Sequence, residues 1–224
     1  MSGIRLIIAL LAVLAMSATI AATSASASLP EAELLPGESF PVESTSTIKG
    51  TEVAFIESSL GLLIICNELK ELLTLETAHL GKFDDHWVGC KDNGVNVNTI
   101  GDAAGVMLFK GTEHLVFVLL SPLAVGTVRQ LEEATLEIGK AKVKVKGVVV
   151  AGLSPLNEET TKYKLNLKCS GKGKQELSSY FNEAGESLTK QLPLINAGLG
   201  NENACYAAKE ELSMSSNKML KIKG

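Results

Sequence analysis

The chain has 224 residues, of which 21 are basic and 25 acidic, giving a formal net charge of −4. A slightly acidic chain is poorly suited to bind nucleic acid or an anionic membrane surface, so we expect neither as a partner. A chain of this length buries enough surface to fold without a metal, and it is expected to form one domain or two small ones.

The first 27 residues have the three-part layout of a secretory signal peptide. Arg5 precedes an uncharged, largely apolar run over residues 6–22, and Ala25 and Ala27 follow at the spacing of a cleavage site. The alternative is that the run is retained as a membrane anchor, since it approaches the length of a short transmembrane span. We expect cleavage after Ala27, a secreted or cell-surface protein, and no membrane span in the mature chain.

The remaining chain divides into a linker and a β-domain. Residues 28–46 contain Pro30, Pro36 and Pro41 among Glu, Ser and Thr, a composition typical of a flexible linker. Residues 47–224 show short runs rich in Val, Leu and Ile, separated by turn residues. This pattern predicts an all-β fold, an antiparallel sandwich or barrel-like structure with at most one or two short helices. If the domain consists of two packed β subdomains, they would divide near residues 122–130.

The β-domain contains four cysteines, an even number that indicates disulfides in an exported protein. Three connectivities are possible, and the cost of loop closure favours joining neighbours, Cys66 with Cys90 and Cys169 with Cys205. A metal or redox site is disfavoured because the chain has no C-x-x-C motif.

The segment "HLGKFDDHWVGC" contains the best candidate for a metal site. If Gly81 and Lys82 form a hairpin turn, His79 lies opposite Asp84, with His86 on the same face, and these three side chains could bind a transition metal. The alternative that we favour is a polar hairpin tip with its histidines in water. We therefore expect no metal and no other cofactor.

Two segments fit either a helix or a strand. The stretch "NELKELLTLE" is rich in helix formers, and "VRQLEEATLEI" places apolar residues on one helical face. For the second, however, a turn at Gly139 and Lys140 makes a hairpin in which Glu137 faces Lys142 and Leu136 faces Val143. This register matches apolar with apolar residues and acids with lysines, so it favours a strand.

Two lysine-rich strand faces are the candidate binding surfaces. The runs "GKAKVKVKG" and "KYKLNLK" alternate lysines with apolar residues, as half-exposed strands do. Their combined face could attract an acidic polymer or protein of the cell envelope, although a solvated face already paired with acids is the simpler interpretation. The lysines concerned are Lys142, Lys144, Lys146, Lys162, Lys164 and Lys168.

The sequence contains no motif of a known catalytic class. We find no G-x-S-x-G elbow, no H-E-x-x-H and no phosphate-binding loop. A pair of carboxylates that meets only in the folded chain would escape such a search, so a β-sandwich hydrolase remains an alternative. Aromatic residues make up only 4% of the chain, which lowers the odds of a sugar-binding cleft.

Three stretches resemble recurring segments of exported β-rich proteins of unknown function from actinobacterial genomes. They are "GDAAGVMLFKGTEHLVFVLL" from Gly101, "VKVKGVVVAGLSP" from Val143 and "KCSGKGKQELSSYFNEAGE" from Lys168. The resemblance implies secretion and a β-rich fold, and it assigns no activity or site residues. The sequence therefore predicts a secreted, disulfide-stabilised structural or binding module, with a hydrolase or a carrier of a metal or small ligand as alternatives.

Overall fold

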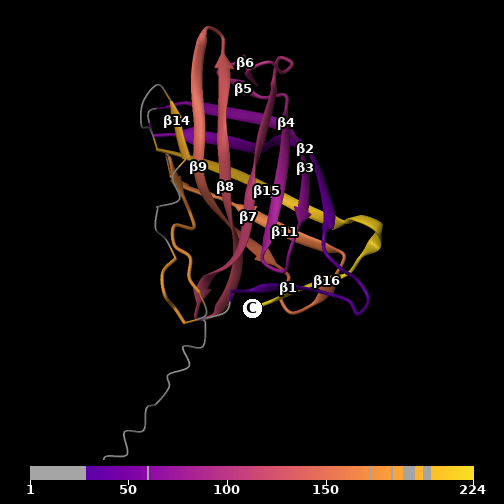
Figure 1. The fold of residues 1–224 in the computed structure, drawn as a ribbon. Helices are drawn as coiled ribbons and strands as arrows, with labels where there is room; N and C mark the ends of the chain where they lie inside the picture. Colours follow the sequence, from indigo (N-terminus) through magenta and orange to yellow (C-terminus); the bar gives the residue numbers. More distant parts are fainter. Residues whose placement is uncertain (1–28, 60, 172, 183, 189–194, 199–202) are drawn as a thin grey trace, which may run out of the picture.

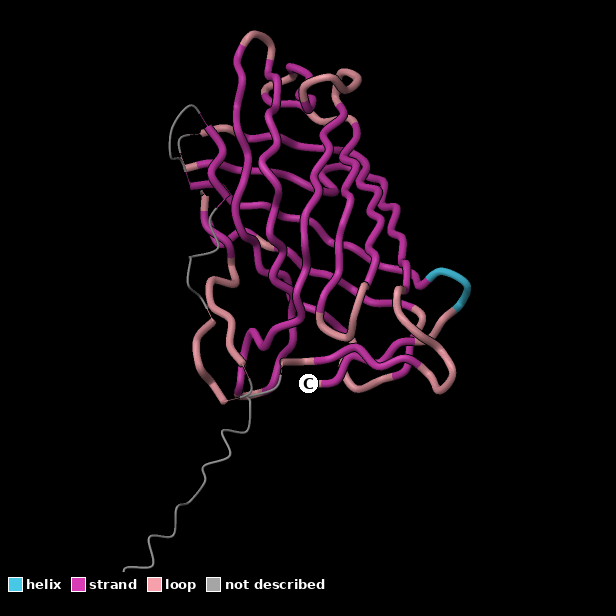
Figure 2. The backbone as a smooth tube through the Cα atoms, in the orientation of Figure 1, coloured by secondary structure: helices cyan, strands magenta, loops and turns pink. Residues whose placement is uncertain are grey.

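The computed structural model describes residues 29–224 except 60, 172, 183, 189–194 and 199–202. The predicted signal peptide lies outside the described residues. The predicted all-β fold is confirmed: in the described part of the chain the only helical segment is the short 3₁₀ turn η1, Ser215–Asn217, and most of the other residues are in strands joined by loops (Figure 2). Nothing in these residues forms a helix long and apolar enough to cross a membrane.

Eight strands pair in sequence to form a closed, barrel-like ring (Figure 1). The order around the ring is β2-β3-β4-β7-β8-β9-β11-β15, and β15 pairs with β2 to close it; every pairing is antiparallel. A further strand, β14, bridges β9 and β15 at one end. The bounds are β2 Val42–Ser58, β3 Leu63–Leu75, β4 Leu80–Val88, β7 Val106–Leu120, β8 Leu123–Ile138, β9 Ala141–Ser154, β11 Lys162–Leu167, β14 Ile195–Gly198 and β15 Asn203–Met214.

Short strands cover the ends of the ring. At one end, β16 pairs with both β1 and β10, and Ala32, Leu220 and Ile222 from this small sheet join the main core (Figure 1). At the other end, β5 and β6 extend the large sheet and bury Val97. The bounds are β1 Glu31–Leu34, β5 Lys91–Asp92, β6 Val95–Thr99, β10 Glu159–Thr160, β12 Cys169–Gly171, β13 Lys174–Gln175 and β16 Leu220–Lys223.

The interior of the ring is packed with side chains from alternate strand positions. In β4, Phe83 and Trp87 are buried while Lys82 and His86 are exposed, as a period of two requires. Trp87 packs edge-on against Phe109, with ring centroids 5.3 Å apart, and lies 4.6 Å from Tyr206. These contacts connect three strands of the ring through its centre.

Part of the ring is buried on both faces. Leu177 and Tyr180 pack over an external cluster formed by β7, β8 and β9. This cover explains why these strands contain continuous apolar runs such as "GVVVAG" instead of strict alternation. The cluster consists of Val116, Val118, Val128, Val148 and Val150.

The hairpin predicted around Gly139 and Lys140 is confirmed. Glu137 lies opposite Lys142 and Leu136 opposite Val143, and the register continues to Ala134 opposite Val145. It then shifts at a bulge between Leu131 and Ala134, so Glu133 is not directly opposite Lys146, as an unbroken continuation of the predicted register would require. Glu133 nevertheless contacts Lys146 through its side chain, because a bulge redirects a side chain without ending the pairing.

The structure differs from one other expectation and decides two questions that the sequence left open. The predicted linker, residues 28–46, contains β1 and the start of β2, and it buries Ala32 and Val42. The segment has few apolar residues, but Ala32 and Val42 are both buried in the main core. The segment "NELKELLTLE" belongs to β3, because its inward-facing residues pack in the ring. Residues 122–130, given as the boundary if the domain were two subdomains, consist of Pro122 and the first part of β8, which lies within the ring.

The four cysteines form the two disulfides that loop closure favours. Cys66 is bonded to Cys90, and Cys169 to Cys205. The first joins β3 to the segment before β5, and the second joins β12 to β15. Each disulfide therefore links a ring strand to a segment that is not one of the eight ring strands.

Candidate functional site: a buried charge cluster and a surface groove

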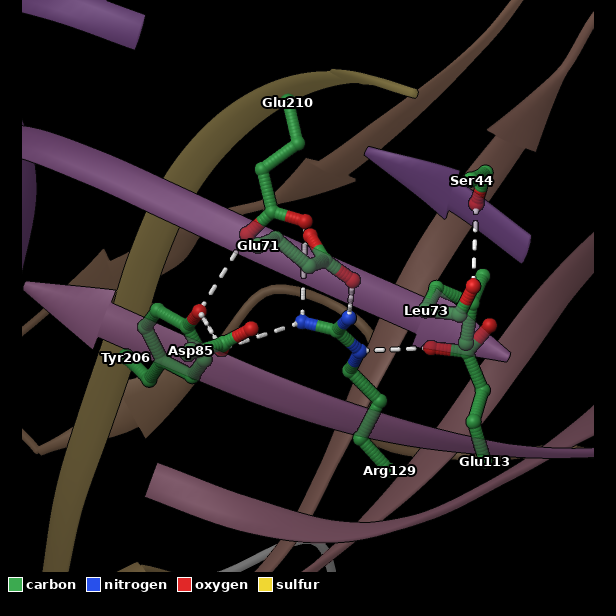
Figure 3. Close-up of polar contacts among 8 residues, drawn as sticks. All are labelled: Ser44, Glu71, Leu73, Asp85, Glu113, Arg129, Tyr206 and Glu210. Atoms are coloured by element: carbon green, nitrogen blue, oxygen red, sulfur yellow. Dashed lines mark hydrogen bonds and ion pairs between the residues drawn. The ribbon is translucent and has the colours of Figure 1, made fainter. Parts of the chain in front are cut away.

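One arginine and four carboxylates meet inside the ring (Figure 3). Each occupies an inward-facing position, and together they come from five of the eight ring strands. The members are Glu71 of β3, Asp85 of β4, Glu113 of β7, Arg129 of β8 and Glu210 of β15. None exposes more than 4% of its surface, which is rare for charged residues unless they are paired.

Arg129 is the centre of this cluster. Its Nε donates to Glu113 at 2.6 Å, and its Nη2 donates to Glu71. Its Nη1 lies 3.5 Å from Asp85 Oδ2 and 3.5 Å from Glu210 Oε2. All three guanidinium nitrogens therefore face carboxylates, an arrangement that the planar five-donor group of arginine permits and lysine does not.

Tyr206 and Phe83 complete the surroundings of the arginine. The Tyr206 hydroxyl lies 3.0 Å from Asp85 Oδ2 and 3.2 Å from Glu210 Oε1, so it connects two of the acids. The guanidinium carbon of Arg129 lies 4.4 Å from the centre of the Phe83 ring, a cation–π contact. Two aromatic side chains therefore help to fix the charges in place.

The cluster contains too many acids for all of them to be ionised. If they were, one positive charge would face four negative charges in a site without solvent. Burial raises the pKa of Asp85 to about 7, even though Arg129 opposes the shift, and burial likewise raises the pKa of Glu71 and of Glu113. The carboxyls of Glu71 and Glu210 face each other, which raises the pKa of Glu71 further (Figure 3). Carboxyls of this cluster therefore keep protons near neutral pH.

The arginine itself stays charged. Burial alone would lower the pKa of Arg129, but Glu71, Glu210, Asp85 and Glu113 together raise it well above its usual value. For Tyr206, burial and the neighbouring acids raise the pKa of the hydroxyl, so it remains a hydrogen-bond donor.

The cluster is closed to substrates. The side chains of Arg129, Glu71 and Asp85 are fully buried. An internal cavity beside Glu113 measures only about 20 Å³ and is otherwise lined mostly by apolar side chains. A space of that size holds no more than a single water molecule. The geometry therefore fits a structural role, in which one arginine joins five strands of the ring.

Gly111 of β7 provides room beside the Arg129 contact with Phe83. A Cβ at this position would overlap the carbonyl oxygen of Gln130 and lie 2.8 Å from Phe83 Cζ. We expect Gly111→Ala to lower the free energy of unfolding by about 1–3 kcal/mol, because a backbone group cannot move aside as a flexible side chain can. Urea titration measures this change. Gly152→Ala is the control, since its nearest neighbour is Leu177 Cδ1 at 3.9 Å; equal losses in both variants would contradict the prediction.

The lysine faces predicted as candidate binding surfaces are largely paired with glutamates. Ion pairs join Lys144 and Lys146 to Glu133, Lys142 to Glu137, Lys162 to Glu211 and Lys168 to Glu176. Of the six lysines, Lys164 alone forms no ion pair with another described residue. These five pairs are exposed and each contributes little to stability, but they reduce the positive charge that a polyanion would meet.

The histidine tip differs from its predicted geometry. Gly81 and Lys82 lie within β4, opposite Leu75 and Thr74, because the turn spans residues 76–79. His86 lies 3.2 Å from Asp84, which also pairs with Lys110, while His79 contacts the carbonyl oxygen of Pro30. Within the described ranges, no three His, Cys, Asp or Glu side chains come close enough to bind a metal.

The buried cluster escaped the sequence analysis, although a signal was present. Asp85 lies between Phe83 and Trp87 at the spacing of one strand face, and Glu113 precedes an apolar run. Once the strand is assigned, a charge on the apolar face predicts a buried partner. The partner itself depends on how distant strands pair, which these local patterns do not specify.

The outer surface has a groove where the pairing of β15 with β2 is interrupted. The two strands pair on both sides of a gap between Ala208 and Ser213, while β11 pairs with β15 throughout this stretch. Two neighbouring hollows of about 440 and 370 Å³ lie there and share Ile48 and Lys209. Their size matches that of small-molecule sites.

Comparisons with protein-family models, curated proteins and solved structures found no match. The candidate site therefore has to be interpreted from its geometry and chemistry.

Proposed function

We propose that the protein is a binding module that acts outside the cytoplasm, as a secreted or cell-surface protein, and contacts its ligand with the outer wall of the ring. The observation that carries this proposal is the interior: it is filled, and its charged groups are fully buried around Arg129. A ligand therefore has to bind outside, where the groove between β2, β11 and β15 offers a concave surface.

Two features support a location outside the cytoplasm. The four cysteines form two disulfides, and such bonds persist in oxidising compartments. The layout of residues 1–27 and the resemblance to exported actinobacterial proteins favour the same location. Export, and action in the cell envelope, belong to the proposal.

A hydrolase is less well supported. It needs two carboxylates that reach a substrate, as glycosidases require. The described structure does bring carboxylates together, but Arg129 bridges them and solvent does not reach them. These acids therefore favour a structural role over a catalytic one.

The proposal is tested by mass spectrometry of the untagged protein recovered from its own host. We expect it in the exported fraction, cleaved after Ala27, and heavier by four daltons after reduction of two disulfides under denaturing conditions. In its native state it should retain a ligand or partner. An uncleaved, reduced protein recovered from the cytoplasm would contradict the proposal.

A further inference from the structure

The groove in the outer wall combines an apolar floor with a basic rim. Its larger hollow, about 440 Å³, is lined by apolar side chains from three strands, and its smaller hollow continues past Ile48 toward β11. The apolar lining comprises Ile48, Val53, Phe55, Leu167, Ala207 and Ala208. Lys164, Lys168 and Lys209 line the same two hollows.

Two of these lysines differ from the paired lysines of the neighbouring faces. Lys164 and Lys209 form no ion pair with any other described residue, whereas Lys168 is paired with Glu176 at 3.5 Å. Of the acids in the smaller hollow, Glu211 lies opposite Lys164 in the register and shares its charge between Lys162, at 2.8 Å, and Lys164, while the Glu210 carboxyl is turned inward to Arg129 (Figure 3). In a protein of net charge −4, the two lysines place positive charge beside an apolar hollow.

We propose that this groove binds an anionic amphiphile, with its hydrocarbon chain on the apolar floor and its acidic head group between Lys164 and Lys209. This inference rests on the proposed function and names the ligand class for it. Each methylene that leaves water on binding strengthens affinity about fourfold. The lysines form charge-assisted hydrogen bonds with an anionic head group. A neutral head group gains no such interaction, so it binds more weakly.

The dimensions favour a small ligand over a protein partner. A stable protein interface buries about 800 Å² on each side and is usually flat. The groove is instead concave and confined to the gap between β2 and β15, and its apolar lining is flanked by polar strand faces. A single hydrocarbon chain fits this shape.

The test uses isothermal titration calorimetry of residues 28–224 with dodecanoate, and with 1-dodecanol as the neutral analogue, both below the concentrations at which they aggregate. We expect dodecanoate to bind at least tenfold more tightly than dodecanol, and decanoate to bind roughly sixteenfold more weakly than dodecanoate. Lys164→Gln with Lys209→Gln should weaken dodecanoate binding about tenfold and leave dodecanol binding unchanged. Because both lysines are on the surface, the thermal unfolding midpoint should stay the same.

The matched control is Lys142→Gln with Lys144→Gln, which removes the same charge from the β8–β9 face. Equal weakening in both double variants would overturn the groove as the site, since it would indicate a general charge effect. Equal affinity for dodecanoate and dodecanol would overturn the role of the lysines. If neither compound binds, the ligand class is wrong, whereas an exported, oxidised protein carrying some other ligand would leave the proposed function standing.

Discussion

Arg129→Met is expected to unfold the protein at neutral pH. The substitution keeps much of the side-chain volume but leaves Glu71, Asp85, Glu113 and Glu210 buried without a cation. Removing one partner of a buried ion pair costs about 3–5 kcal/mol, and here one residue serves four acids. That loss is comparable with the whole stability of a typical domain, about 5–15 kcal/mol. Circular dichroism and urea titration at pH 7 measure it.

The matched control for this prediction is Lys144→Met, which removes one positive charge from an exposed pair with Glu133. An exposed pair of this kind contributes little to stability because solvent and salt screen it, so the control should remain folded. Adding Asp85→Asn to Arg129→Met should recover part of the lost stability, because an amide replaces a buried carboxyl that no longer has a cation beside it and must hold a proton in the fold. If Arg129→Met were as stable as the control, the cluster would not hold the ring together.

The local parts of this fold are accessible from the sequence. The β8–β9 hairpin follows from alternation and from the glycine at the turn, since a shift of one residue would place apolar side chains opposite lysines. The cysteine pairing follows from the lower cost of closing short loops, and the structure joins the same partners. In both cases the interacting residues are close in the chain, so local patterns carry the information.

Features that depend on pairing between distant strands cannot be predicted from such local patterns. The ring closes where β15, Asn203–Met214, pairs with β2, Val42–Ser58, and the sequence between them gives no spacing that selects this partner. The buried cluster depends on that closure, because Glu210 and Tyr206 come from β15 while Asp85 and Arg129 come from other strands. The groove depends on it as well, since it lies where β15 and β2 separate. Both candidate sites are therefore products of tertiary pairing.

The protein is expected to be more stable at pH 5 than at pH 8. The folded-state pKa of Asp85 is about 7, raised by burial from the ordinary value of 3.8. Between these values the folded chain holds a proton that the unfolded chain has released, so stability falls as pH rises. The favourable contribution is fully present below the unfolded pKa and is lost as pH passes through 7. For one proton, the free energy of unfolding changes by about 1.4 kcal/mol per pH unit in this range.

The neighbouring acids act in the same direction. Burial also raises the pKa of Glu71 and of Glu113, so protonation of these groups adds to the effect of Asp85. We therefore expect the thermal unfolding midpoint to drop by several degrees from pH 5 to pH 8, measured by calorimetry at constant ionic strength. In Asp85→Asn, the free energy of unfolding should depend less steeply on pH between pH 5 and pH 7, by the amount that one proton contributes. A midpoint that rises from pH 5 to pH 8 would show that these carboxyls are ionised in the folded state.

Surface acids determine the pH below which stability no longer rises on acidification. Hydrogen bonds from Lys144 and Lys146 lower the pKa of Glu133, and a hydrogen bond from Lys162 lowers that of Glu211. A lowered pKa contributes stability that is fully present above the ordinary pKa of a carboxyl, and this contribution is lost as pH falls from that value through the lowered folded-state pKa. The buried and exposed acids therefore oppose each other only at low pH. The stability maximum should lie in the weakly acidic region, where the buried carboxyls are protonated and the surface pairs are still intact.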